Sequence, residues 1–168
     1  GLLAVLMMAG VAFSISMRTE RLGAGGFRFG VSARNLVWAG LARAVQNDVD
    51  ACWEAVKHAA HPRIHVFLSS SDIQIMHQLE KGKDEVLEMA RTQVARAAKY
   101  CPDVEFSPMD ATRSDPAYVY QMLTECIDAG ATTLNIPDTL GYTVPEEFAQ
   151  FLRDIQENVP NIHKAVIS

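Results

Sequence analysis

The feature that most constrains the fold is an alternation of short apolar runs with longer segments of helical spacing, repeated from residue 36 onward. The apolar runs begin near residues 36, 63, 104, 132 and 164. Each repeat is therefore about 30 residues long, which is the size of one strand followed by one helix. An alternation of this kind predicts a parallel sheet flanked by helices, so we expect an α/β fold with about five parallel strands.

The segments between the apolar runs have the spacing of amphipathic helices. Val86, Ala90, Val94 and Ala97, for example, share one helical face. Asn47 is predicted to cap the first helix, because its side chain can accept a hydrogen bond from a free backbone N–H. Further helices are predicted over residues 84–100, 116–129 and 145–158.

Two architectures have this alternation, the doubly wound sheet and the eight-fold (β/α)8 (TIM) barrel. A doubly wound nucleotide-binding protein normally has a G-x-G-x-x-G fingerprint after its first strand, and the sequence there is AGLARA. We therefore predict a partial (β/α)8 barrel over residues 34–168. Residues 1–33 contain an uncharged stretch followed by a Gly- and Arg-rich stretch, and we treat them as an unassigned leader.

Charge and cysteine usage exclude several function classes. The formal net charge of -5 argues against nucleic acid as a partner, since binding to phosphates requires a basic surface. The uncharged stretch, residues 1–16, is shorter than the ~20 residues that a membrane-spanning helix needs, so no membrane association is expected. Cys52, Cys101 and Cys126 are far apart and form no C-x-x-C pair, which favours a reducing, cytoplasmic location.

The predicted strands divide into an aliphatic face and a polar face, because side chains alternate along a strand. Ile64, Val66 and Leu68 share one face of the second strand. The opposite faces of three strands carry polar or aromatic side chains: His65, Phe67 and Ser69, then Glu105 and Ser107, then Thr133 and Asn135. Burying such groups without partners costs about 1 to 3 kcal/mol each, so we expect them to line a polar hollow near the carboxyl ends of the strands.

Three sequence blocks resemble the alpha-isopropylmalate synthase family, which is related to homocitrate and citramalate synthases and to acyl-CoA lyases. The blocks are GLARAVQNDVDACWEAVKHAAHPRIHVFLSSSDIQIMHQL, DVEFSPMDATRSD and AGATTLNIPDTLGYTVPEEF. The resemblance implies a (β/α)8 barrel that condenses the acetyl group of acetyl-CoA with 2-oxoisovalerate in leucine biosynthesis. It also implies a cytoplasmic enzyme that is a homodimer at full length.

The resemblance implies a set of substrate-binding residues, namely His65, Ser107, Asn135, Pro137 and Thr139. Thr139 and its neighbouring backbone amides are suited to the carboxylate of the oxo acid. No catalytic residue is assigned. Met109 stands where the family often has glutamate, and whether Asp110 replaces that carboxylate is an open question.

The family's enzymes use a divalent metal, manganese, magnesium or zinc, to polarise the ketone of the oxo acid. Their metal aspartate lies in an Arg-Asp-Gly-Glu-Gln type motif, which residues 1–35 do not contain. Their two metal histidines lie in a His-x-His motif that would follow Ser168. We therefore expect the metal ligands to be absent from this chain. A zinc site at His58, His61 and His65 is not favoured, because these residues fall on a helix end, a loop and a strand.

We therefore expect the chain to be an incomplete piece of a 2-isopropylmalate synthase-like acyltransferase and to be inactive alone. One alternative is a related homocitrate or citramalate synthase or an acyl-CoA lyase. Another alternative is a non-catalytic, barrel-derived binding protein.

Overall fold

The computed structural model describes residues 38–168. The predicted leader, residues 1–33, and the proposed domain boundary next to it lie outside the described residues. No helix in the described part of the chain combines the length and the apolar character that a membrane span requires.

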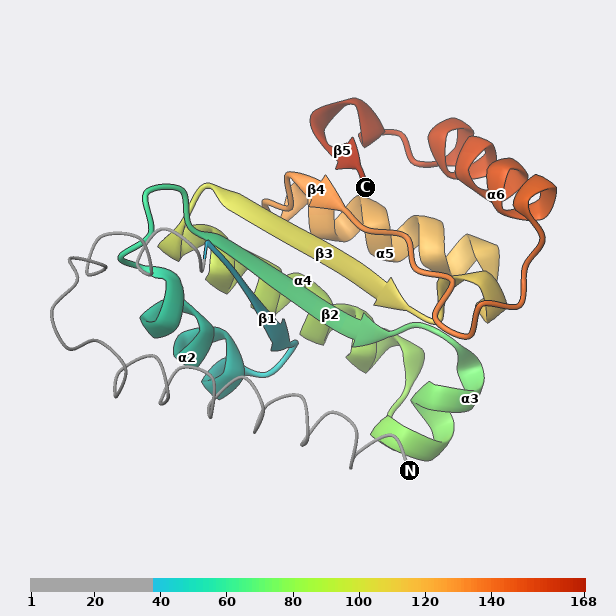
Figure 1. The fold of residues 1–168 in the computed structure, drawn as a ribbon. Coiled ribbons are helices and arrows are strands. Elements are labelled where there is room, and N and C mark those ends of the chain that lie inside the picture. Colours follow the sequence, from blue (N-terminus) through green and yellow to red (C-terminus); the bar gives the residue numbers. More distant parts are fainter. Residues whose placement is uncertain (1–37) are drawn as a thin grey trace, which may run out of the picture. The chain divides into compact units, whose positions relative to one another are not determined.

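The described residues form one sheet of five parallel strands, in which the order of the strands follows the order of the chain (Figure 1). The strands are β1 (Ala39–Arg43), β2 (Arg63–Ser69), β3 (Asp103–Met109), β4 (Thr133–Leu134) and β5 (Val166–Ile167). Each strand pairs with the strands before and after it in the sequence. Every connection therefore steps in the same direction across the sheet.

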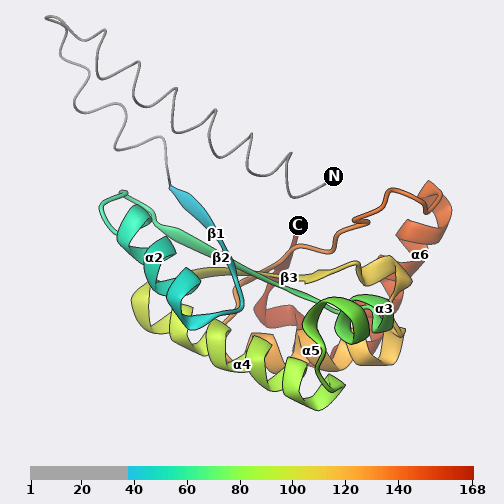
Figure 2. The same ribbon diagram turned by 90° about the horizontal axis from the view of Figure 1, so that it is seen from below.

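Helices connect successive strands. They are α2 (Gln46–Val56), α3 (Asp72–Gln74), α4 (Lys83–Tyr100), α5 (Pro116–Asp128) and α6 (Pro145–Asn158). Pro116 and Pro145 occupy the first turn of their helices, where the missing N–H has no partner to lose. Helices α2, α4 and α5 lie along one face of the sheet (Figure 2).

The arrangement decides between the two predicted architectures. A doubly wound sheet reverses its strand order and has helices on both faces. Here the order is sequential, and none of the helices within residues 38–168 covers the opposite face, which we call the helix-free face (Figure 2). Sequential parallel strands with helices on one side are the arrangement of part of a (β/α)8 barrel, which confirms the predicted fold class.

The hydrophobic core lies between the sheet and helices α2, α4 and α5. The predicted aliphatic face of β2 is confirmed, since Ile64, Val66 and Leu68 are all buried. They contribute to a single cluster with Val104 and Phe106 of β3. Burial of each such side chain contributes roughly 1.5 to 3 kcal/mol, so this layer holds the strands in register.

Several local boundaries differ from the predicted ones. Helix α2 begins at Gln46 with Val45 as its N-cap residue, so the predicted cap at Asn47 is wrong. Strand β1 ends at Arg43, whose Nε donates to Asp48 Oδ2 at 2.5 Å in the first turn of α2.

The loop that follows β2 and the strand β4 also differ from expectation. No helix was predicted between Ser69 and Asp84, but this segment contains α3, which continues into a π-helical turn at Ile75–Leu79. The expected strand around residues 132–136 is reduced to Thr133–Leu134. Asn135 still donates its backbone N–H to Phe106 at 3.0 Å, and beyond it the chain leaves the sheet.

Candidate functional site

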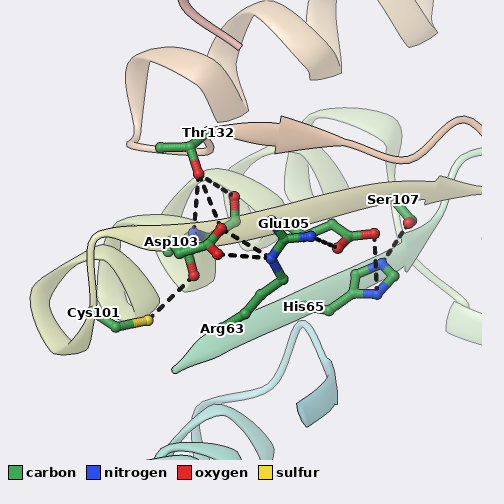
Figure 3. Close-up of polar contacts among 8 residues, drawn as sticks. Arg63, His65, Cys101, Asp103, Glu105, Ser107 and Thr132 are labelled. Atoms are coloured by element: carbon green, nitrogen blue, oxygen red, sulfur yellow. Dashed lines mark hydrogen bonds and ion pairs between the residues drawn. The ribbon is translucent and has the colours of Figure 1, made fainter. Parts of the chain in front are cut away.

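Five polar side chains gather on the helix-free face of β2 and β3 (Figure 3). The parallel register places Arg63 beside Asp103 and His65 beside Glu105. Ser107 follows two residues after Glu105 and therefore points to the same face. We call Arg63, His65, Asp103, Glu105 and Ser107 the strand-face network.

The charged members of the strand-face network are paired. Arg63 Nε lies 2.9 Å from both carboxylate oxygens of Asp103, and Arg63 Nη1 donates to Glu105 Oε2 at 2.9 Å. The other oxygen of Glu105, Oε1, lies 3.5 Å from His65 Nδ1. Glu105 is nearly buried, and its carboxylate is paired with the Arg63 guanidinium, as a buried charge requires.

His65 and Ser107, which the sequence predicted to share a face, are in direct contact. His65 Nε2 and Ser107 Oγ lie 2.6 Å apart, the distance of a strong hydrogen bond. Burial lowers the pKa of His65, the charge of Glu105 opposes this, and Arg63 adds to the lowering. The net pKa falls below the ordinary value of His65, so its imidazole is neutral at pH 7.

The remaining predicted site residues follow β4. Asn135 extends the register of β4 next to Ser107, because Glu105 pairs with Thr133 and Phe106 with Leu134. Pro137 and Thr139 stand in the loop beyond it, and the side chain of Thr139 accepts the backbone N–H of Asp110 at 2.9 Å. No described residue accepts a hydrogen bond from the backbone N–H of Thr139.

A second set of polar groups joins the loops at the carboxyl ends of β2, β3 and β4. We call Ser71, Asp110, Arg113 and Thr139 the edge network. Ser71 Oγ donates to Asp110 Oδ2 at 2.6 Å, and Arg113 Nε donates to Asp110 Oδ1 at 2.8 Å. Asp110 has a left-handed backbone with φ of 69°, and this conformation turns its N–H toward Thr139 while its carboxylate is fully buried.

The edge network answers the question about Asp110. Burial raises the pKa of Asp110, but hydrogen bonds from Arg113 and Ser71 and the Arg113 charge outweigh this and leave the pKa below its ordinary value. Both carboxylate oxygens already accept hydrogen bonds, and a carboxylate held in this way is a weak base. Asp110 therefore serves to join the loops and does not offer a free carboxylate in place of the family glutamate at Met109.

Asp138, between Pro137 and Thr139, is also occupied. Its carboxylate accepts hydrogen bonds from the hydroxyls of Thr143 at 2.6 Å and Thr112 at 2.9 Å. These bonds, led by that from Thr143, lower the pKa of Asp138 to about 2, although burial opposes them. Asp138 therefore holds the loop around Thr139 in place.

The described residues do not form a metal site by themselves. Within residues 38–168 no three His, Cys, Asp or Glu side chains come together in a group that could hold a metal ion. The carboxylates beyond the ends of β3 and β4, Asp110 and Asp138, are engaged by Arg113, Ser71 and threonine hydroxyls. Met109, at the end of β3, offers only a thioether, which suits neither magnesium nor manganese.

Sequence reasoning did not assign roles to Arg63 and Glu105. A usable signal was present, because Glu105 lies in the middle of an apolar strand, and a buried carboxylate requires a cationic or hydrogen-bonding partner. The partner, Arg63, is 42 residues away in the sequence and is recognisable only from the pairing of β2 with β3.

Sequential parallel strands, helices on one face and polar groups on the other define a segment of a (β/α)8 barrel with a candidate binding surface at its strand ends. Solved structures support this fold. The chain superimposes on hydroxymethylglutaryl-CoA lyase from Pseudomonas aeruginosa with a TM-score of 0.60 and 17% identity, covering 84% of this chain and 46% of that one. HMG-CoA lyase from Bacillus subtilis gives a TM-score of 0.55 at 18% identity, covering 74% and 42%.

The chain belongs to the HMGL-like family, whose model matches residues 30–168. Its relatives include 2-isopropylmalate synthase from Syntrophus aciditrophicus (strain SB), 54% identical over 77% of this chain and 25% of the relative. The 2-isopropylmalate synthase from Gloeothece citriformis (strain PCC 7424) is 56% identical over 77% of this chain and 24% of the relative. The chain thus spans about a quarter of the length of these curated relatives.

Proposed function

We propose that this chain forms part of the 2-oxo acid pocket of a 2-isopropylmalate synthase, an acyltransferase that condenses the acetyl group of acetyl-CoA with 2-oxoisovalerate. The observation that carries the proposal is the hydrogen-bonded His65–Ser107 pair on the helix-free face. More than half of the aligned residues are identical to those of proteins named 2-isopropylmalate synthase, which supports this assignment over other barrel functions.

The proposed roles follow from position and chemistry. His65, Ser107 and Asn135 lie on neighbouring strands of the helix-free face and would line the pocket. Thr139 would bind the carboxylate of the oxo acid through its backbone N–H, which has no acceptor among the described residues. Pro137 would fix the direction in which the loop leaves β4.

When bound, a divalent metal would polarise the ketone of the oxo acid, and we propose that parts of the complete protein other than residues 38–168 supply its ligands. The contribution of this chain is to bind and orient the oxo acid. We further propose that the complete protein is a cytoplasmic homodimer of leucine biosynthesis.

The test is a chimera in which residues 38–168 replace the matching segment of the Syntrophus aciditrophicus relative. If the segment contributes the pocket, the chimera should release CoA from acetyl-CoA when 2-oxoisovalerate is present. Loss of this activity in a folded chimera of the relative's native oligomeric state would contradict the proposal.

Thr139→Val in the same chimera should raise the KM for 2-oxoisovalerate about 10-fold, because valine keeps the shape but removes the hydroxyl that holds the loop. Thr132→Val is the matched control. Thr132 lies at the opposite, amino end of β4, where its hydroxyl contacts Asp103 and Val104, and its loss should leave the KM unchanged.

A panel of oxo acids separates the proposed activity from those of related barrels. Faster turnover with 2-oxoglutarate would favour homocitrate synthesis, and faster turnover with pyruvate would favour citramalate synthesis.

A further inference from the structure

We propose that Glu105 is a positioning residue for the His65–Ser107 pair. Its carboxylate keeps the proton of neutral His65 on Nδ1, so that Nε2 accepts the hydroxyl hydrogen of Ser107. The Ser107 oxygen then presents its lone pairs to the helix-free face. The position of the proton on His65 is independent of the proposed function. The effect of a bound oxo acid on His65, argued below, rests on the proposed function.

The first step of the argument is that the Glu105 carboxylate is fixed in place (Figure 3). Arg63 Nη1 donates to Oε2, while Arg63 Nε is held by Asp103. This leaves Oε1 of Glu105 facing His65 Nδ1 at 3.5 Å. The Glu105 side chain is only 12% exposed, so little water is present to screen the interaction.

The second step concerns the proton of the imidazole. A bare Nδ1 would turn its lone pair toward a carboxylate oxygen, which is repulsive, whereas an Nδ1–H would be attracted to it. With the proton on Nδ1, Nε2 of a neutral imidazole can only accept a hydrogen bond. The contact of 2.6 Å between Nε2 and Ser107 Oγ is then donated by the serine hydroxyl.

Among residues 38–168, the strands beside His65 add no competing carboxylate. At the same level of the sheet, β1 presents Leu41 and β4 presents Thr133. Arg43 of β1 lies one row nearer the carboxyl ends of the strands, and Asp103 is neutralised by Arg63. Glu105 is therefore the anionic group that acts on Nδ1.

The arrangement has a consequence for ligands. To donate to a ligand oxygen, the Ser107 hydroxyl must turn away from His65, and Nε2 must then donate to Ser107. Nδ1 keeps its proton because of Glu105, so His65 must take up a second proton from solvent. On the proposed function, binding of an oxo acid oxygen at Ser107 is accompanied by the uptake of one proton, and Glu105 stabilises the resulting imidazolium.

The experiment is long-range 1H–15N NMR of the chain labelled with 15N-histidine, which distinguishes the protonated ring nitrogen from the bare one. The His65 signal is assigned by its loss in His65→Asn. At neutral pH we expect the Nδ1–H form of His65 in the wild type and a mixture of tautomers in Glu105→Gln. Asp103→Asn is the matched control, because Asp103 also binds Arg63 but does not contact His65, and it should keep the Nδ1–H form.

An Nε2–H form in the wild type, or an unchanged tautomer in folded Glu105→Gln, would overturn the proposal. If Glu105→Gln does not fold, Ser107→Ala tests independently whether Glu105 or Ser107 selects the tautomer of His65. The Nδ1–H form should persist in this variant if Glu105 selects it, and a switch to Nε2–H would show that Ser107 was the cause.

Addition of 2-oxoisovalerate separates this inference from the proposed function. Binding at Ser107 should raise the pKa of His65 measured by the same spectra. If the wild type has the Nδ1–H form but no resonance responds to the oxo acid, the positioning role stands and the proposed pocket fails. If the oxo acid shifts the ring resonances of His65 while His65 stays neutral, the proton coupling is wrong.

Discussion

The two polar networks of this molecule hold similar residue types in different ways. The strand-face network is built on alternate positions of two adjacent strands, and Arg63, His65 and Asp103 remain partly exposed on the helix-free face. The edge network instead joins three loops around one fully buried carboxylate, that of Asp110. The first is held by the sheet, whereas the second holds the loops.

This difference between the two networks indicates which polar groups are free to bind a ligand. Both oxygens of Asp110 are occupied by Arg113 and Ser71. In the strand-face network, Ser107 contacts His65 and keeps further hydrogen-bonding capacity toward the helix-free face. The number of polar residues near the strand ends is therefore a poor guide to a site unless the occupied acceptors are first identified.

The largest effect is expected for Asp110→Ala, which removes the centre of the edge network. The substitution leaves Ser71 and Arg113 without their acceptor and places alanine in a left-handed conformation that it disfavours. We expect the free energy of unfolding to fall by about 3 kcal/mol. Urea denaturation followed by circular dichroism measures this.

Asp110→Asn is the matched control for this substitution. Asparagine tolerates the left-handed conformation and keeps one acceptor oxygen, so about half of the loss should be recovered. Equal losses for alanine and asparagine would mean that only the charge matters, and negligible losses would mean that the loops are held by other contacts.

Asp110 also makes the free energy of unfolding depend on pH in a defined direction. The pKa of Asp110 is lower in the folded protein than the ordinary value of about 3.9 in an unfolded chain. Its ionised carboxylate therefore stabilises the fold above about pH 4, and this contribution is lost as pH falls through the folded pKa. Stability measured between neutral and acid pH should fall less steeply below about pH 4 in Asp110→Asn than in the wild type; parallel curves would contradict the assignment.

A smaller effect is expected for Arg63→Met, which keeps the aliphatic volume but removes the guanidinium from the strand-face network. Glu105 then loses its cation while nearly buried, so the free energy of unfolding should fall by about 2 kcal/mol. Arg43→Met is the control, because the Arg43–Asp48 pair is exposed and its loss should change stability little. Similar losses for both variants would show that burial of Glu105 does not matter.

Much of the fold was predictable because local signals agreed with tertiary packing. The strand at Arg63–Ser69 and the helix at Pro145–Asn158 were placed correctly, the first by its apolar alternation and the second by its initial proline. The cap at Asn47 was wrong because only Ala44 and Val45 separate β1 from α2, and the end of a strand depends on a partner that the local sequence does not reveal. For the same reason β4 was predicted too long.

The candidate site was predictable only in part. Alternation along β2 and β3 correctly placed His65 and Ser107 on one face, because both strands are regular and in register. The edge network was not predicted, since it depends on the left-handed backbone of Asp110 and on a loop contact with Ser71, 39 residues away in the sequence. Loop geometry of this kind follows from the assembled sheet and not from local pattern.

The smallest expected effect tests whether the two networks are independent. Arg63 pairs with Asp103 at the start of β3, and Asp110 follows the end of that strand. At about 3.3 Å per residue, seven residues of extended chain separate Asp103 from Asp110 by roughly 20 Å, and the two networks share no hydrogen-bonding partner. The losses of Arg63→Met and Asp110→Ala should therefore add to within about 0.5 kcal/mol in the double variant. A larger coupling energy in the urea-denaturation cycle would mean that the strand ends transmit strain between the networks, and the helix-free face and the loops would then have to be treated as one unit.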